Sequence, residues 1–324
     1  MIYERHAKRL RCPYPAEPKV CINKPNHRRT SIYICKFLTS TSIPAWCIKV
    51  LFINYGRGRL MTKFADKILA VKDGHVGRFT INNPDKRNCV SLAMWEQIGD
   101  IFEEWSIDPE VRVIIVTGAG DKCFCAGADI KEFDAVRKTS EQIAHYEAVF
   151  DRAIYNVGQV PKPTIARIDG ACIGGGFELA MLCDLRIAAD RATFGVTPAR
   201  IGLGYSMNGI RLLMDNMSPA VVRELLYTGR HFPAIDAYRW GALNRIVPAS
   251  SLDETISAYA EEIAANAPLT VRAVKITTAE AMKHPDNCDN LAADQAVEAC
   301  NLSEDFLEGQ KAFAEKRKPV FNGR

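Results

Sequence analysis

One stretch of the sequence decides the fold that we expect: residues 161–190 read PKPTIARIDGACIGGGFELAMLCDLRIAAD. Its β-rich run at 164–168 leads through a turn to three glycines, and an apolar helix is predicted over 177–183. A second strand-like run follows at 185–188. Strand, helix and strand in this order are typical of an α/β fold with crossover connections.

Three consecutive glycines, Gly174 to Gly176, equip the start of this helix to bind an oxygen anion. Glycine lets a ligand approach the backbone closely, and the unpaired N–H groups of a first helical turn point outward as donors. Glu178 is the one carboxylate in that turn. A carboxylate beside free N–H donors can move a proton while an oxyanion forms. Glycines also permit tight helix–strand packing, and the loop alone leaves both interpretations open.

The sequence lacks the signatures of several common site types. It contains no G-x-x-x-x-G-K-[ST], and its central glycines do not fit G-x-G-x-x-G. The 11 cysteines include no C-x-x-C pair, the 6 histidines form no H-x-x-x-H, and there is no G-x-S-x-G. We therefore expect free, buried thiols in a reducing compartment, no metal site, and neither zinc-protease nor serine-hydrolase chemistry.

The first 60 residues differ in charge from the remainder of the chain. The whole, 48% hydrophobic and 25% charged, has the composition of an ordinary soluble globular protein. Residues 1–60 hold 12 Lys and Arg against 2 acidic residues, a net charge of +10. Residues 61–324 hold the other 30 Lys and Arg against 36 Asp and Glu, a net charge of −6. The two parts therefore carry net charges of opposite sign.

No sustained periodicity organises residues 1–60. The apolar run at 43–55 is too short to cross a membrane, and prolines interrupt the amphipathic helix of a mitochondrial transit peptide. We expect the working domain to begin near Met61, with residues 1–60 as a basic extension outside the core. A cytoplasmic location is expected, and a mitochondrial one is the alternative if the extension is a transit segment.

Further elements extend the alternation ahead of the central stretch. They are strands predicted at 68–71, 76–81 and 111–116 and helices predicted at 91–105 and 140–157. The turn Asp73-Gly74 joins the first two strands.

Beyond residue 252 the chain is predicted to be helical. The first of four helices begins at a capping box, Ser251 to Glu254, and the others cover 269–282, 290–301 and 304–316. Their apolar residues could pack on the core, on another subunit, or on both. We divide the chain into the extension, a core at 61–252 and a helical region at 253–324.

A second motif indicates which protein family the sequence resembles. Residues 122–133 read KCFCAGADIKEF, and with IDGACIGGGFELAMLCD at 168–184 they resemble the enoyl-CoA hydratase/isomerase family, also called the crotonase family. The likeness runs from about residue 65 to 324. It includes the segments at 83–88, 227–230, 243–247 and 313–317.

The resemblance implies a fold and a substrate. The expected fold is α/β, a crotonase-like spiral of ββα units with a C-terminal helical region that builds trimers. The expected assembly is a homotrimer or a dimer of trimers. The substrate would be a coenzyme A thioester, with no separate cofactor and no membrane or nucleic-acid partner. By resemblance, the N–H groups of Ala128 and Gly175 hold the thioester oxygen and Glu178 is a catalytic acid–base residue. Lys131, Phe313 and Lys316 match positions near the phosphates and adenine of coenzyme A.

The sequence departs from this family at one catalytic position. Hydratases carry a second glutamate in F-G-x-P-E-x-x-x-G, whereas this chain reads FGVTPARIG at 194–202, with Pro198 at the glutamate position. No Asp or Glu occurs between Arg191 and Met214. Hydration would then depend on Glu178, with Tyr205 or Ser206 as a proton source.

The sequence leaves two alternatives to hydration open. The stretch from Thr197 to Tyr205 looks like the methylmalonyl-CoA decarboxylase branch, whose chemistry needs an enolate but no base, although that branch tends to carry His at the position of Ala128. A non-catalytic member could bind RNA through residues 1–60, in a salt-dependent way. We place hydratase-like chemistry first.

Overall fold

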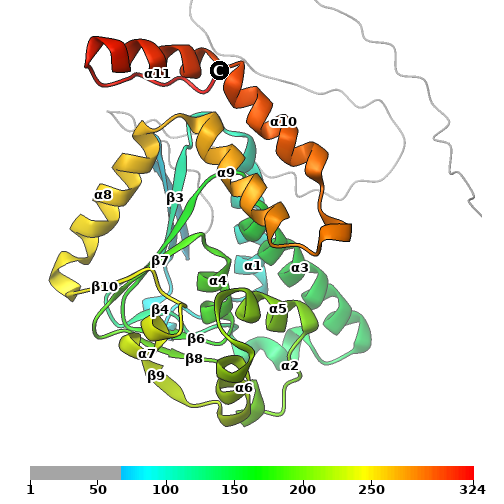
Figure 1. Ribbon diagram of the computed structural model, residues 1–324. Coiled ribbons are helices and arrows are strands. Elements are labelled where there is room, and N and C mark those ends of the chain that lie inside the picture. The colour runs from blue at the N-terminus through cyan, green and yellow to red at the C-terminus, as the bar shows by residue number, and fades with distance from the viewer. Residues whose placement is uncertain (1–66) are drawn as a thin grey trace, which may run out of the picture. The chain divides into compact units, whose positions relative to one another are not determined.

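The structure is a computed structural model that describes residues 67–324 (Figure 1). The extension and the domain start expected near Met61 lie outside the described residues. Runs of Val, Ile and Ala form the centre of a six-stranded sheet. Its strand order is β1 (Ile68–Asp73), β2 (Val76–Ile81), β3 (Val113–Gly118), β5 (Thr164–Ile168), β7 (Leu185–Ala189) and β10 (Arg245–Val247).

Four short strands form a second sheet. Three of them directly follow a strand of the large sheet along the chain. The order of the second sheet is β4 (Cys123–Cys125), β6 (Ala171–Ile173), β8 (Thr193–Gly195) and β9 (His231–Pro233). Only the pairs β1–β2 and β8–β9 are antiparallel. Three times in succession the chain places one strand in the large sheet, the next in the small sheet, and then forms one or more helices. This repetition is the predicted spiral of ββα units, and the α/β fold is confirmed.

The helices between these strands contribute side chains to the main core, which also includes side chains from one face of the large sheet. They are α1 (Leu92–Ile107), α2 (Phe133–Val136), α3 (Ser140–Gln159), α4 (Gly175–Leu182), α5 (Met207–Asn216), α6 (Pro219–Thr228) and α7 (Ala234–Arg239). On α1 the predicted apolar face is buried, including Trp95, Ile98 and Phe102. That face packs on α3, which begins with a capping box at Thr139.

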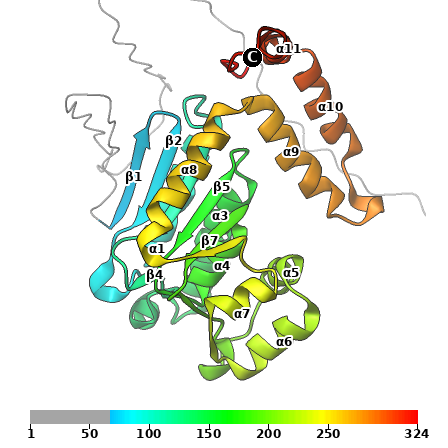
Figure 2. The same ribbon diagram turned by 60° about the vertical axis from the view of Figure 1, so that its left-hand side comes forward.

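Helix α8 (Leu252–Ala265) covers the opposite face of the large sheet (Figure 2). Side chains alternate along β3, so that Ile114 and Val116 join the main core while Val113 and Ile115 contact the α8 side. Because both faces are covered, the strands read as continuous apolar runs.

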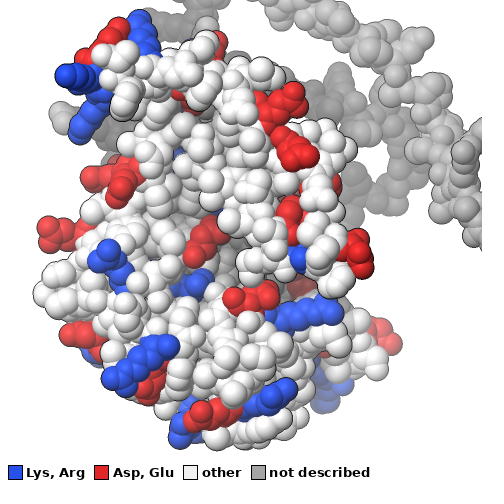
Figure 3. All heavy atoms as spheres, in the orientation of Figure 1, with Lys and Arg blue, Asp and Glu red and all other residues white. Residues whose placement is uncertain are grey.

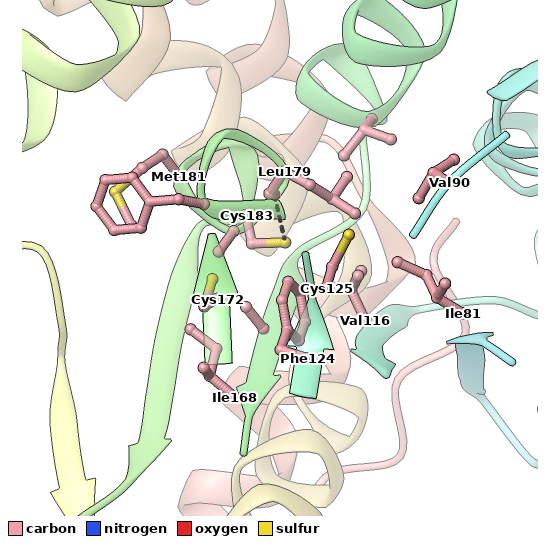
Figure 4. Close-up of a cluster of buried hydrophobic side chains, with 14 of the residues drawn as sticks. Ile81, Val90, Val116, Phe124, Cys125, Ile168, Cys172, Leu179, Met181 and Cys183 are labelled. Atoms are coloured by element: carbon pink, nitrogen blue, oxygen red, sulfur yellow. Dashed lines mark hydrogen bonds between the residues drawn. The ribbon is translucent and has the colours of Figure 1, made fainter. Parts of the chain in front are cut away.

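Free thiols fill part of the main core beneath α4 (Figure 4). Cys125, Cys172 and Cys183 are buried there, close to Phe124 and Leu179. Burial raises the pKa of the Cys125 and Cys183 thiols to about 12, so these groups stay protonated. In the described part of the chain the cysteines are unpaired, as predicted. Burial holds for Cys123, Cys125, Cys172 and Cys183, whereas Cys89, Cys288 and Cys300 are half-buried.

The remaining C-terminal helices are α9 (Pro268–Ala281), α10 (Asn290–Asn301) and α11 (Glu304–Glu315), close to their predicted ranges. Figures 1 and 2 both show α10 and α11 standing off the sheets. Helix α9 is tied to the core by Lys275, whose Nζ lies 2.7 Å from Asp184 Oδ2. None of the helices within 67–324 has the length and apolarity to cross a membrane.

Some predicted boundaries were wrong. Helix α4 begins at Gly175 rather than at 177, and β3 begins at Val113 rather than at 111. The capping box at Ser251 does not form, because a 3-10 turn (Ala249–Ser251) leads directly into α8 and places Ser251 in helical conformation with no side-chain cap.

Candidate active site

The three glycines at the start of α4 have separate structural reasons. Gly174 has a φ of 56°, which favours glycine, and its N–H donates to the Gly195 carbonyl. Gly176 lies against β4, where an added Cβ would be 2.2 Å from the Cys125 carbonyl oxygen. Gly175 stands between them on the wall of a cavity. Tight packing and an open N–H donor, the two interpretations of the loop, therefore both apply, at different residues.

The second expected donor, Ala128, follows β4 in a short parallel bridge with Val90. The bridge uses the Val90 N–H, which donates to Gly127 O at 2.9 Å, and the Asp129 N–H, which donates to Val90 O at 2.9 Å. The Ala128 N–H therefore points to the other side. Between described residues, no backbone hydrogen bond outside the regular helices and strands uses the Ala128 or Gly175 N–H.

These two donors lie side by side. A Cβ added to Gly175 would be 3.8 Å from the Ala128 nitrogen, and one added to Gly127 would be 3.0 Å from the Gly175 nitrogen. Gly127 also has a φ of 89°, a backbone conformation that favours glycine. Both the close approach and this φ therefore favour glycine at position 127. Two neighbouring N–H groups that make no backbone hydrogen bond within the described residues are the kind of donors that an oxyanion hole requires.

Both donors line a cavity of about 390 Å³, together with Glu178, Pro198 and Tyr205. The structure thus brings together all four residues that the sequence assigned to catalysis. Pro198 is buried at the start of a 3-10 turn (Pro198–Arg200), so the family's second glutamate position supplies no carboxylate here.

The Glu178 carboxyl is poised to hold or release a proton near neutral pH. Burial is the largest cause that raises its pKa to about 7, and the negative charge of Asp151 acts in the same direction. The Tyr205 hydroxyl acts in the opposite direction. Burial therefore determines the direction of the shift.

Tyr205 lies beside Glu178, and Gly209 of α5 makes room for both. A Cβ at Gly209 would be 2.7 Å from the Tyr205 ring and 3.3 Å from Glu178 Oε1. The buried Tyr205 hydroxyl influences the Glu178 charge but makes no hydrogen bond of good geometry within the described residues. Burial raises the Tyr205 pKa, so the phenol stays protonated as a donor. The Ser206 hydroxyl oxygen instead caps α5, accepting from the Gly209 N–H at 3.0 Å.

Three charged residues that the sequence did not single out also line the cavity: Arg137, Glu147 and Asp151. The Arg137 guanidinium lies 4.8 Å from the Tyr146 ring centroid and 3.2 Å from Glu147 Oε1. Glu147 and Asp151 are four residues apart on α3, so both fall on one helix face. That spacing was visible in the sequence, but which face of α3 meets α4 was not.

The residues expected near coenzyme A are dispersed. Lys131 is exposed in a 3-10 turn (Ile130–Glu132) beside Ile130, which lines the cavity. Phe313 is 88% exposed on α11, and Lys316 ends that helix in left-handed conformation. Neither Phe313 nor Lys316 lines the cavity. Their roles stay predictions.

Known proteins resemble this chain in both sequence and structure. The sequence profile of the enoyl-CoA hydratase/isomerase family matches residues 72–324. A carnitinyl-CoA dehydratase of Proteus mirabilis is 35% identical over 255 residues, which are 78% of this chain and 96% of the relative. An enoyl-CoA hydratase/carnithine racemase structure from Magnetospirillum magneticum superimposes with a TM-score of 0.77 at 36% identity, covering 81% of this chain and 97% of that one. An enoyl-CoA hydratase structure from Bacillus anthracis superimposes with a TM-score of 0.74 at 34% identity, covering 80% of this chain and 100% of that one.

Proposed function

Because this chain belongs to the enoyl-CoA hydratase/isomerase family, we propose that it catalyses the reversible addition of water to the double bond of an enoyl-CoA thioester. It is accordingly a lyase acting on coenzyme A thioesters, and dehydration of a 3-hydroxyacyl thioester is the same reaction in reverse. Coenzyme A is part of the substrate, and the reaction as proposed uses no separate cofactor.

One observation carries this proposal: the donor pair and a carboxyl with a pKa of about 7 share one cavity. The N–H groups of Ala128 and Gly175 bind the thioester oxygen. They bind it more strongly as it gains negative charge, which lowers the barrier to enolate formation. Glu178 exchanges a proton with the reacting groups, and its pKa is matched to neutral pH.

We also propose how the coenzyme A portion is held. Lys131 lies next to the cavity and is exposed, so its ammonium group can pair with a phosphate. Phe313 and Lys316 do not line the cavity of their own chain, and we assign them to the coenzyme A of a neighbouring protomer in a homotrimer. The exposure of the Phe313 ring is consistent with that arrangement.

The two alternatives to hydration gain no support. The relatives named above are dehydratases and hydratases rather than decarboxylases. The RNA-binding alternative concerns residues 1–60, which lie outside the described residues. On the face of the described residues that Figure 3 draws, acidic and basic side chains are interspersed, so that face offers no broad basic area to a polyanion.

Loss of the conjugated-thioester absorbance of crotonyl-CoA tests the proposed function. The wild-type protein is expected to consume crotonyl-CoA, and Glu178→Gln is expected to lose the activity while keeping its fold. Methylmalonyl-CoA serves as the second substrate. A wild-type protein that ignores crotonyl-CoA but releases CO₂ from methylmalonyl-CoA would overturn the proposal.

A further inference from the structure

Helix α3 presents two carboxylates to the cavity, one helical turn apart. Glu147 is paired with the guanidinium of Arg137. The Asp151 side chain, in contrast, makes no ion pair and no hydrogen bond with any residue of the described part, 67–324. It is exposed to solvent, so protons and water can reach it. Asp151 is thus an unpaired carboxylate on the wall that also holds Glu178.

Asp151 and Glu178 act on each other electrically. After burial, the charge of Asp151 is the next cause that raises the Glu178 pKa. Both carboxylates also line the same cavity, so the water that enters it is accessible to the two of them. The other groups beside the pair are the Tyr205 hydroxyl, next to Glu178, and the Arg137–Glu147 pair on the cavity wall.

Hydration requires two proton-handling tasks, one at the water and one at the α-carbon. The family's second glutamate would share these tasks, but Pro198 occupies its position. Two neighbouring carboxyl groups with different surroundings divide naturally into an acid and a base. Glu178, which is more buried, is the group biased toward the protonated form.

Building on the hydratase function proposed above, we infer that Asp151 is the second acid–base carboxylate of this site and replaces the glutamate missing at Pro198. Asp151 accepts a proton from the water as the water oxygen bonds to the β-carbon. The electron pair of the double bond moves onto the thioester oxygen, forming an enolate held by Ala128 and Gly175. The α-carbon then takes the proton of Glu178. Proton transfer from Asp151 to Glu178 through solvent restores both groups, so the elements of water are added and nothing else changes.

Asp151→Asn tests this role because it keeps the shape and removes the charge. We expect kcat for crotonyl-CoA hydration to fall by about 100-fold or more, with KM changed by less than about threefold. We also expect the limb of the pH–rate profile that reports Glu178 to move to lower pH, since the neighbouring negative charge is gone. Loss of packing alone would not move that limb.

Two further variants keep the test decisive. Asp151→Glu retains the charge and should keep the limb in place. Glu141→Gln makes the same charge change as Asp151→Asn at an exposed position in the first turn of α3, and it should leave both rate and profile unchanged. The pKa of Glu178 is read separately by NMR of ¹³C-labelled glutamate and should fall in Asp151→Asn even without substrate.

Wild-type rate in Asp151→Asn, or a reduced rate with an unmoved profile and an unmoved NMR titration, would overturn the role of Asp151. If Glu178→Gln is inactive while Asp151→Asn is fully active, only this inference fails. If the wild-type protein hydrates no enoyl-CoA, the proposed function itself fails.

Discussion

At the scale of single residues, the site is defined by what Glu178 and Ala128 lack. Among residues 67–324, no cationic side chain pairs with Glu178; burial and the charge of Asp151 raise its pKa to about 7. Ala128 donates no backbone hydrogen bond to the described residues, because its bridge to Val90 uses the neighbouring peptide groups. Unsatisfied groups of this kind cost stability and are retained where a ligand satisfies them.

The raised pKa of Glu178 predicts a trade between activity and stability. The folded-state pKa lies above the usual value, so stability present below pH 4.5 is lost as the pH rises through about 7. Glu178→Gln removes the buried charge. It should therefore raise the free energy of unfolding by about 1–3 kcal/mol at pH 8, with little change at pH 4, while abolishing hydration. Denaturant unfolding at both pH values checks this, and a variant less stable than wild type at pH 8 would contradict it.

The free N–H of Ala128 gives a second residue-scale prediction. Ala128→Pro removes that donor and adds little bulk, so kcat should fall by about 100- to 1000-fold. Steady-state kinetics measures the loss, with circular dichroism and oligomeric state required to match wild type. Turnover retained in a correctly folded variant would remove Ala128 from the oxyanion hole.

At the scale of elements, the placement of α4 decides the site. Gly176 allows the helix to touch the Cys125 carbonyl of β4, and the next strand, β6, delivers the turn that starts the helix. The first turn of α4 is thereby held against the loop that carries Ala128. Support from packed elements is what positions a donor pair before substrate binds.

Substitution of adjacent glycines separates packing from catalysis in α4. An added methyl at Gly176 would lie 2.2 Å from the Cys125 oxygen, whereas one at Gly175 would lie no closer than 3.7 Å to atoms beyond its chain neighbours and the backbone of its own helix. Gly176→Ala should therefore lower stability by about 2 kcal/mol or more, while Gly175→Ala should unfold near the wild-type temperature with reduced kcat. Thermal unfolding compares the two. Equal stability of both variants would contradict the packing described here.

Element order was largely predictable from the sequence, but contacts between elements were not. Apolar runs predicted the central strands, and the spacing of Trp95, Ile98 and Phe102 predicted the buried face of α1. The capping box at Ser251 failed because a 3-10 turn leads into α8 there. Asp151 was missed because its place in the cavity depends on how α3 packs against α4, and no local pattern reports that packing.

At the scale of the whole molecule, the helices after α8 are incompletely covered. Large apolar side chains stay exposed on α9, α10 and α11, among them Val274, Leu291, Leu307 and Phe313. Such a surface suits the homotrimer that we propose, in which α11 would reach a neighbouring protomer. Oligomeric assembly would then complete the coenzyme A site, while the acid–base groups come from one chain.

The basic extension yields a prediction at this scale. A protein beginning at Met61 should be soluble, hydrate crotonyl-CoA at the wild-type rate and keep its oligomeric state, because the family match covers residues 72–324 only. Size-exclusion chromatography with light scattering and the hydration assay measure both properties. Insoluble protein, or a fall in kcat beyond about threefold, would show that residues 1–60 contribute to the working domain.

The origin of the product's hydroxyl group tests the central claim most directly. Crotonyl-CoA is incubated with the protein in H₂¹⁸O, and the acyl-CoA product is analysed by mass spectrometry. Water addition that depends on Glu178 predicts a 3-hydroxyacyl thioester carrying one ¹⁸O atom with the wild-type protein, and unchanged crotonyl-CoA with Glu178→Gln. Unchanged crotonyl-CoA with the wild-type protein, or the same labelled product at the same rate with Glu178→Gln, would contradict the account.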